Sequence, residues 1–381
     1  MNSRVATSLE SVKHRPFYRD RKVDRFQAAI VAHAQSRRNR NHDGSKRCDL
    51  LPGDSLFVVR ACTDQPPESL LKGAHTPDAS GISQRIAARV TTSDVNNANP
   101  RELFMGDRKF VWGARTYVMG ILNVTPDSFS GDGTGNDLQR AVGLALSFED
   151  DGADIIDIGG ESSRPQSVYN NAHPVSPEEE AQRVIPVIEA LRGRLSIPIS
   201  IDTQKSTVAS LAVLSGASIV NDVSMLGSDS GMADVVAGLD VPLIINHTRR
   251  RAVYPSGVVA EVIEDLRRTA KLVEDVGLTP SKVILDPGIG FGKTVQQSID
   301  MQRGLSKLVD LGYPVLIGTS RKSSIGKVLG LPMDQRIEGT AATVALAIER
   351  GADIVRVHDV KEMVRVARMS DAIVRGWSPK A

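Results

Sequence analysis

Cysteine is nearly absent from the sequence: the 381 residues include only two, Cys48 and Cys62. Two thiols cannot build a disulfide framework or a four-cysteine zinc site, and such scarcity suits a reducing compartment. Aromatic residues make up 4% of the chain, too few to predict a surface on which single-stranded nucleic acid would stack. The formal net charge is +2, so no excess of one sign predicts a nucleic-acid or membrane partner.

Long apolar runs are also missing, since no stretch reaches the roughly 18–20 residues that a membrane helix needs. The first thirty residues carry acids and lack the apolar centre of a secretory signal. We therefore expect a cytoplasmic protein, although the arginine and serine content of this segment leaves an organellar transit segment open. A P-loop is absent as well. The segment "LDPGIGFGKT" ends like one, but the position six before Lys293 is Pro287, which has no N–H to offer a phosphate.

The composition changes near residue 110. Before it lie polar, basic or asparagine-rich segments such as "SRRNRNHDGSKR" and "TTSDVNNANP". Such a composition buries too little apolar surface to offset the entropy of the chain. We predict a largely disordered or loosely folded extension over residues 1–105 and a folded domain over residues 110–381. A basic arm that binds an anionic partner is the alternative for the extension.

Eight short apolar runs follow, each ending in polar residues: "YVMGILNVTP", "ADIIDIGGESSRP", "IPISIDTQK", "ASIVNDVS", "VPLIINHT", "KVILDPGIG", "YPVLIGTSRK" and "ADIVRVHDV". Continuous apolar runs fit strands buried on both faces, as in parallel sheets. Helix-like stretches alternate with them; in "SPEEEAQRVIPVIEALRG" serine, proline and the acids stand where a helix begins. This repeat predicts an α/β protein with a (β/α)₈ TIM barrel. A doubly wound open sheet is the rival.

Polar residues gather at the ends of these runs. In TIM barrels the catalytic side chains come from the C-terminal ends of the strands. One polar residue at a strand end is expected as a helix cap, but a full ring of them is hard to explain by capping alone. The ring consists of Asn123, Asp157, Glu161, Ser163, Arg164, Asp202, Asn221, Asp222, Asn246, His247, Asp286, Ser320, Arg321, Lys322, Arg356, His358 and Asp359.

The chemistry of this ring indicates a class of substrate. Asp202, Asn221 and Asp286 can recognise the edge of a flat heterocycle, because a carboxylate accepts two parallel hydrogen bonds from an amino group and a ring N–H. The cationic side chains can bind phosphate or carboxylate. Asn123 offers a neutral oxygen suited to Mg²⁺, which keeps most of its waters. These residues indicate a heterocycle with a phosphorylated arm, although each one alone also fits a cap or an ion pair.

Seven segments then carry a resemblance to a known family. In chain order they are "GILNVTPDSFSGDG", "DIGGESSRPQS", "SIDTQK", "IVNDVS", "ILDPGIGFGKT", "IGTSRKSSIGKVLG" and "ADIVRVHDV". Together they resemble the dihydropteroate synthases, a family of pterin-binding TIM barrels in folate biosynthesis. The resemblance covers about residues 110 to 375.

The resemblance implies a transferase that joins 6-hydroxymethyl-7,8-dihydropterin pyrophosphate to p-aminobenzoate and releases pyrophosphate with the help of Mg²⁺. We also expect a homodimer. The family's roles fall on matching positions. The pterin would be held by Asp202, Asn221, Asp286 and Lys322. The pyrophosphate and its metal would be bound by Asn123, Arg356 and His358. The p-aminobenzoate side would be lined by Ser163, Arg164, Pro165, Phe291 and Ser323. The candidate catalytic residues are Asp202, Asp286, Lys322 and Arg356.

Three segments depart from the family pattern. Gly131 follows Phe129 and Ser130, so that the acid of this loop is displaced by one residue, to Asp132. Ser163 stands where the family often has threonine. After the fifth run, "NHTRRRAVYP" is more basic than the usual Met-His-Met type of segment. Two other functions stay open: a pterin-binding domain that passes a methyl group to a corrinoid, and a non-catalytic paralogue that only binds pterin.

Overall fold

The structure is a computed structural model, and it describes residues 102–125, 136–161 and 175–377. Within these ranges, eight parallel strands form one sheet in the order β8-β7-β6-β5-β4-β3-β10-β9, and a bridge between Leu285 and Val315 joins its two edges. The strands are β3 (Tyr117–Asn123), β4 (Ile155–Gly159), β5 (Ile199–Asp202), β6 (Ile219–Asp222), β7 (Leu243–Asn246), β8 (Val283–Asp286), β9 (Leu316–Ile317) and β10 (Ile354–Val357). The predicted TIM barrel is confirmed, and the open sheet is not formed.

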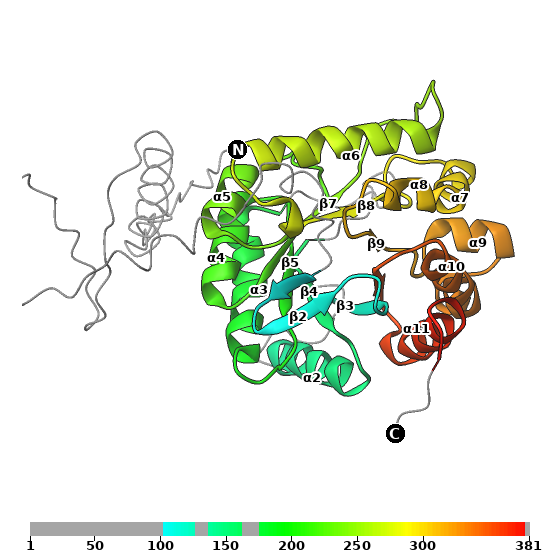
Figure 1. Cartoon of the computed structure of the whole chain (residues 1–381). Coiled ribbons are helices and arrows are strands. Elements are labelled where there is room, and N and C mark those ends of the chain that lie inside the picture. The colour runs from blue at the N-terminus through cyan, green and yellow to red at the C-terminus, as the bar shows by residue number, and fades with distance from the viewer. Residues whose placement is uncertain (1–101, 126–135, 162–174, 378–381) are drawn as a thin grey trace, which may run out of the picture. The chain divides into compact units, whose positions relative to one another are not determined.

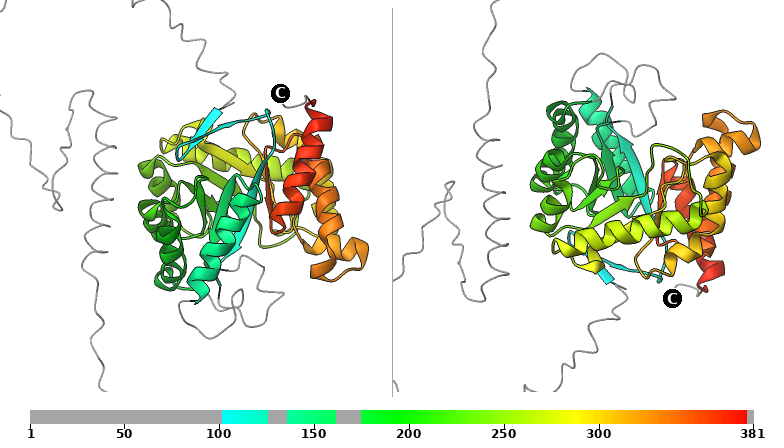
Figure 2. Two further views of the ribbon diagram at one scale, coloured as in Figure 1. Left: turned by 90° about the horizontal axis from the view of Figure 1, so that it is seen from below. Right: turned by 90° about the horizontal axis from the view of Figure 1, so that it is seen from above.

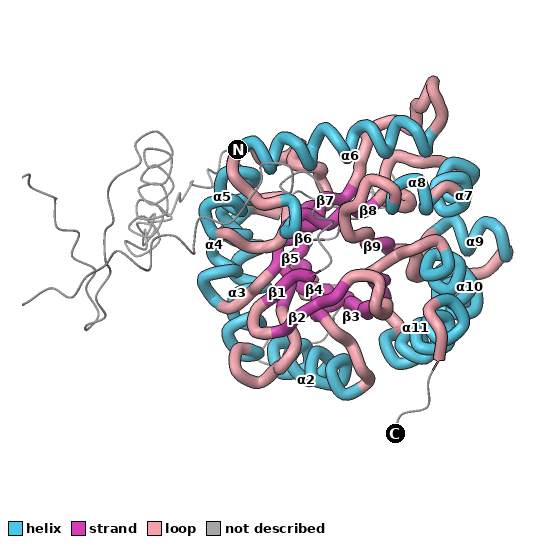
Figure 3. Tube along the Cα trace, viewed as in Figure 1, coloured by secondary structure: helices cyan, strands magenta, loops and turns pink. Residues whose placement is uncertain are grey.

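Helices surround the strands (Figure 3) and follow them in alternation along the chain (Figure 1). They are α2 (Asn136–Asp150), α3 (Pro177–Leu191), α4 (Ser206–Ser215), α5 (Met232–Leu239), α6 (Val258–Asp275), α7 (Val295–Arg303), α8 (Leu305–Val309), α9 (Ser323–Leu329), α10 (Ile337–Glu349) and α11 (Val360–Val374), with 3₁₀ turns η3 (Pro280–Lys282) and η4 (Met333–Gln335). Across the described ranges, no helix has the length and apolar character needed to cross a membrane.

Helix α3 shows how local sequence sets these elements. The side chain of Ser176 accepts a hydrogen bond from the backbone N–H of Glu179, and Pro177 occupies the first helical position, where its missing N–H costs nothing. Three acids in the first turn complement the positive end of the helix. The helix start predicted at Ser176 is therefore confirmed.

Every second residue along a strand points its side chain into the barrel interior. Five isoleucines are fully buried in one interior cluster: Ile155, Ile219, Ile244, Ile284 and Ile354. Side chains alternate between the two faces of a strand, so the residue two positions later faces the interior again. Those residues are Asp157, Asn221, Asn246, Asp286 and Arg356, here called the polar layer. The barrel thus has an apolar interior covered by a polar layer at the C-terminal ends of its strands.

A hairpin closes the opposite end of the barrel (Figure 2). Strands β1 (Glu102–Met105) and β2 (Arg108–Val111) pair in antiparallel fashion. Their side chains join the interior isoleucines in one buried cluster, through Leu103, Met105, Phe110 and Trp112. Residues 102–105, which the sequence assigned to the extension, therefore pack into the barrel, because their alternating apolar side chains cover its base.

Two truncated chains, one with the hairpin and one without it, test how much the hairpin contributes to stability. A chain that starts at residue 102 should keep the midpoint of thermal unfolding and the turnover of the full chain. A chain that starts at residue 113 should lose roughly 5 kcal/mol or more of its free energy of unfolding, because it removes four large buried apolar side chains and exposes the interior residues that they cover. Thermal unfolding with a parallel activity assay measures both. Equal midpoints for the two truncations would show that the hairpin is dispensable.

Candidate active site

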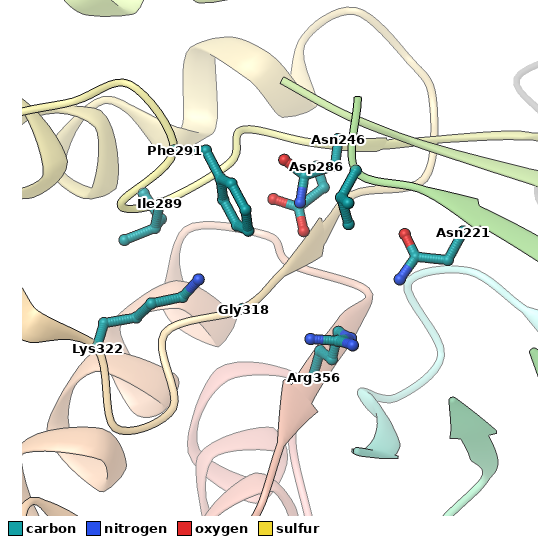
Figure 4. Close-up of a pocket in the computed structure, with 9 residues that line it drawn as sticks. Asn221, Asn246, Asp286, Ile289, Phe291, Gly318, Lys322 and Arg356 are labelled. Atoms are coloured by element: carbon teal, nitrogen blue, oxygen red, sulfur yellow. The ribbon is translucent and has the colours of Figure 1, made fainter. Parts of the chain in front are cut away.

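A pocket opens at the polar layer. Its walls come from the ends of β6, β7, β8, β9 and β10 and from the loops that follow them, and Figure 4 shows how the side chains lie. The lining residues are Asn221, Val223, Asn246, Asp286, Ile289, Phe291, Gly318, Lys322 and Arg356. Amide, carboxylate and cationic groups therefore face a space whose walls also include the apolar side chains of Val223, Ile289 and Phe291. Sites for small molecules combine apolar walls with a few polar groups in this way.

Asp286 is the carboxylate at the end of β8. It is 3% exposed, and its Oδ1 accepts a hydrogen bond of 2.7 Å from the backbone N–H of Gly288. Burial raises the pKa of Asp286 to about 6, while that N–H and the charge of Lys322 act in the opposite direction. Near neutral pH the group is thus a carboxylate that can accept further hydrogen bonds.

Arg356 crosses the barrel interior from β10. Its Nε donates to Oδ2 of Asp157 at 2.6 Å, and its Nη2 donates to Oδ2 of Asp202 at 2.7 Å. Asp157 also accepts from Nδ2 of Asn221, at 3.0 Å. Burial raises the pKa of Asp202 to about 7, against the opposing charge of Arg356. The guanidinium is therefore held by two carboxylates, and Asp202 contacts the pocket through Arg356 rather than as a lining residue.

Lys322 and Phe291 form the other side of the pocket. The Nζ of Lys322 lies 4.3 Å from the centre of the Phe291 ring, a distance that allows a cation–π interaction. In Figure 4 the lysine side chain extends toward the space in front of Asp286. The pocket thus has a cation over an aromatic ring at one wall and an anion at another, as expected for a flat, polar heterocycle.

A half-buried lysine, Lys293, holds the loop that carries Phe291. The Nζ of Lys293 donates to the carbonyl oxygens of Gly288 and Phe291, at 2.9 and 3.2 Å, and lies 2.8 Å from Nδ1 of His247. Burial lowers the pKa of His247 to about 4, so the ring is neutral. Its Nδ1 accepts from Lys293, and its Nε2 donates to Asp265 at 3.2 Å. This loop is thus positioned by the hydrogen bonds of Lys293.

The comparisons with known proteins agree on one family. The profile of the pterin binding enzymes matches residues 119–358, which include every lining residue of the pocket. A dihydropteroate synthase of Clostridium beijerinckii is 46% identical over 272 residues, which are 71% of this chain and 99% of that protein. The chain belongs to the dihydropteroate synthases.

Solved structures of the family have the same fold. A dihydropteroate synthase of Xanthomonas albilineans with 4-aminobenzoic acid aligns with a TM-score of 0.67 and 41% identity, over 72% of this chain and 98% of that one. The same enzyme with 7,8-dihydropteroate aligns with a TM-score of 0.65 and 41% identity, over 71% and 98% of the two chains.

The structure brings part of the family's residue set together. Five of the residues given a role by the family resemblance line the pocket: Asn221, Asp286, Phe291, Lys322 and Arg356. Ser323 begins α9 directly after Lys322 and is exposed. His358 lies beyond the end of β10, where its Nδ1 is 3.0 Å from the Oγ of Ser320. Ser163, Arg164, Pro165 and the displaced Asp132 lie outside the described residues.

Asn123 is the residue expected to hold a metal. It is half-buried at the end of β3, a strand that pairs with β10, where Arg356 is the register partner of Met119. In the described part of the chain, no group of three or more His, Cys, Asp or Glu residues is arranged to bind a metal ion. A neutral oxygen from one asparagine fits Mg²⁺ that is held mainly by substrate phosphates and waters.

Other members of the polar ring have structural roles. Asp222 faces away from the interior and accepts from the backbone N–H groups of Ser224 and Leu226, at 2.7 and 2.8 Å. Arg321 is tied to Asp359 by a bidentate ion pair. Asp222 directly follows the lining residue Asn221, so its direction could have been inferred from the alternation of side chains along β6. The same alternation marks Asp157 and Asn246 as interior residues; the sequence placed both in the polar ring but gave neither a role in the site.

Proposed function

We propose that this chain condenses 6-hydroxymethyl-7,8-dihydropterin pyrophosphate with p-aminobenzoate, giving 7,8-dihydropteroate and pyrophosphate. The observation that carries the proposal is the pocket in the polar layer, where a carboxylate, amides and a lysine line one space together with Phe291. The 4-aminobenzoic acid and 7,8-dihydropteroate complexes of the Xanthomonas albilineans relative support the same chemistry.

The pterin ring is proposed to lie between Phe291 and Arg356. Its amino group and ring N–H would donate to the carboxylate of Asp286, which forms two directional hydrogen bonds. Asn221 and Lys322 would bind the remaining polar atoms of the ring. Both acids near the ring, Asp202 and Asp286, are buried, so their charges act through little water and strongly favour a cationic ring.

The reaction needs no protein nucleophile. The C–O bond at the pterin methylene breaks, its electron pair leaves with pyrophosphate, and the positive charge spreads over the ring. The lone pair of the arylamine then forms the C–N bond, and the amine loses a proton. Asp202 and Asp286 would stabilise the cation, because preorganised charges in a buried site cost no reorganisation in the transition state.

Magnesium is proposed as the counter-ion of the pyrophosphate. When bound, Mg²⁺ neutralises charge on the leaving group. Asn123 would contribute its side-chain oxygen, and His358 would donate to a phosphate oxygen from the neighbouring strand. Ser323, with Ser163, Arg164 and Pro165, is proposed for the p-aminobenzoate side. Pyrophosphate release that falls on removal of Mg²⁺, and returns when it is added back, is the expected result.

A homodimer in the cytoplasm is the proposed state of the chain. Large apolar side chains are exposed on three neighbouring helices and just after the last: Val328, Leu329, Leu346, Met369, Ile373 and Trp377. Large apolar side chains left exposed on adjoining helices are candidates for a protein interface. Sedimentation equilibrium of the chain tests the dimer. The two cysteines of the chain suit a reducing compartment.

Pterin binding should depend on pH. Protonation of Asp286, whose pKa is about 6, turns a hydrogen-bond acceptor into a donor. The affinity for 6-hydroxymethylpterin, which lacks the titrating pyrophosphate, should therefore fall as the pH is lowered through 6. We expect a loss of roughly tenfold between pH 7.5 and 5. Titrations across this range measure it, and Asp286→Asn should remove the step. A flat profile in the parent protein would mean that the ionised carboxylate does not bind the ring.

A steady-state assay of pyrophosphate release tests the proposed reaction. Release should require both the pterin pyrophosphate and p-aminobenzoate, and 7,8-dihydropteroate should form in equal amount. Release without p-aminobenzoate would indicate hydrolysis instead. Tight pterin binding without release under any condition would indicate a non-catalytic pterin-binding protein.

A further inference from the structure

The carboxamide of Asn246 is a buried polar group that the proposed reaction does not use. Asn246 ends β7, lines the pocket and is 5% exposed. Its Oδ1 is buried and has no hydrogen-bond partner among the residues that the structure describes. A buried acceptor without a partner destabilises the ligand-free protein. The contacts of the ligand-free protein therefore do not explain why an asparagine stands at this position.

The surroundings of Asn246 indicate which partner is missing. Asn246 and Asp286 are register partners on the adjacent strands β7 and β8, so their side chains face the interior together. The Oδ1 of Asn246 lies close to Gly288, where an added Cβ would meet it at 2.6 Å. One oxygen of Asp286 already accepts from Gly288. The two neighbouring residues thus present acceptors at one wall of the pocket, and a single group with two N–H bonds would satisfy both.

We propose that Asn246 is a specificity-determining residue whose Oδ1 accepts the second hydrogen of the exocyclic amino group of the pterin. The first hydrogen goes to Asp286. This inference rests on the pterin site proposed above and adds to it a second acceptor for the amino group. Asn246 would then discriminate between pterins and heterocycles of the same shape that lack this amino group, since a site built to hydrogen-bond a substrate group rejects the analogue without it.

Stability and binding should change in opposite directions when Asn246 is replaced. In Asn246→Leu the unpartnered oxygen is gone, so the midpoint of thermal unfolding of the ligand-free protein should stay or rise. The affinity for 6-hydroxymethylpterin should fall five- to tenfold, roughly the effect of one hydrogen bond. Asn246→Met, with an unbranched side chain, is the second variant should leucine not fit. Ser210→Ala is the matched control, because the Oγ of Ser210 is also buried without a partner but lies on α4, outside the pocket.

The deciding experiment compares two ligands by titration calorimetry: 6-hydroxymethylpterin and its 2-deamino analogue, in which hydrogen replaces the amino group. In the parent and in Ser210→Ala, the pterin should bind more tightly than the analogue. In Asn246→Leu the ratio of the two dissociation constants should shrink five- to tenfold, with the affinity for the analogue within twofold of the parent value. An equal loss for both ligands, or no loss, would overturn the inference.

Asp286→Asn separates this inference from the proposed site. If Asp286→Asn weakens pterin binding and Asn246→Leu does not, then the second acceptor is wrong and the pterin site stands. If Asp286→Asn also leaves pterin binding unchanged, then the ring does not bind in this pocket, and both proposals fail.

Discussion

Asp202→Asn should lower kcat/KM for pyrophosphate release by roughly 100-fold, which corresponds to about 3 kcal/mol of transition-state stabilisation. The substitution keeps the size of the side chain. It removes a buried charge that is proposed to stabilise the cationic ring, and it leaves Arg356 with Asp157 as its remaining carboxylate partner. Because Asp202 acts on a developing charge, the loss should fall mainly on kcat. Steady-state kinetics with both substrates measures it.

Asp353→Asn is the control for Asp202→Asn. Asp353 is also a buried acid beside a barrel strand, but it accepts from the backbone N–H groups of Gly113 and Val315 at the far end of the barrel. Its replacement should lower stability and leave kcat/KM within about threefold of the parent value. If Asp202→Asn also stays within threefold, then Asp202 has no part in the mechanism.

Gly288→Ala should cost both stability and activity. Gly288 has a φ of +64°, and an added Cβ would lie 1.8 Å from the carbonyl oxygen of His247. The backbone therefore has to move, and with it the N–H that binds Asp286. We expect a loss of roughly 3 kcal/mol in the free energy of unfolding and at least about 100-fold in kcat/KM. Thermal unfolding and the pyrophosphate assay measure the two effects.

Gly330→Ala isolates the backbone part of this effect. Gly330 has a similar φ of +69°, but an added Cβ would meet no atom within 4 Å. It should cost about 1 kcal/mol of stability and leave catalysis unchanged. Equal losses in the two variants would mean that the contact with His247 is not what makes Gly288 necessary.

Much of the fold could be predicted from the sequence, because a parallel strand buried on both faces leaves a continuous apolar run. All eight runs became strands, even though β9 covers only Leu316–Ile317. The start of the folded domain was predicted too late in the chain: we predicted residue 110, whereas β1 begins at Glu102. The hairpin strands are four residues each, and their role is evident only when Met105 and Phe110 are seen among the interior isoleucines.

The sequence could predict which positions lie at the site, but not the direction in which each side chain points. The ends of the strands contain the pocket residues, yet Asp222 and His247 stand directly beside Asn221 and Asn246 and face the other way. Applying the two-residue alternation from each interior isoleucine would have separated them. The pairing of Arg356 with Asp157 and Asp202 was not predictable, because these strands are about 150 to 200 residues apart in sequence and the contact depends on the closure of the barrel.

A crystal structure of the full chain with bound 6-hydroxymethylpterin is the most direct test of the account. The ring should lie in the pocket between Phe291 and Arg356, with its amino group and ring N–H about 3 Å from the carboxylate oxygens of Asp286. Its 6-substituent should point toward Asn123 and His358, where the pyrophosphate is proposed to lie. A ring bound elsewhere, or one that turns its amino edge away from Asp286, would contradict the assignment of the polar layer as the pterin site.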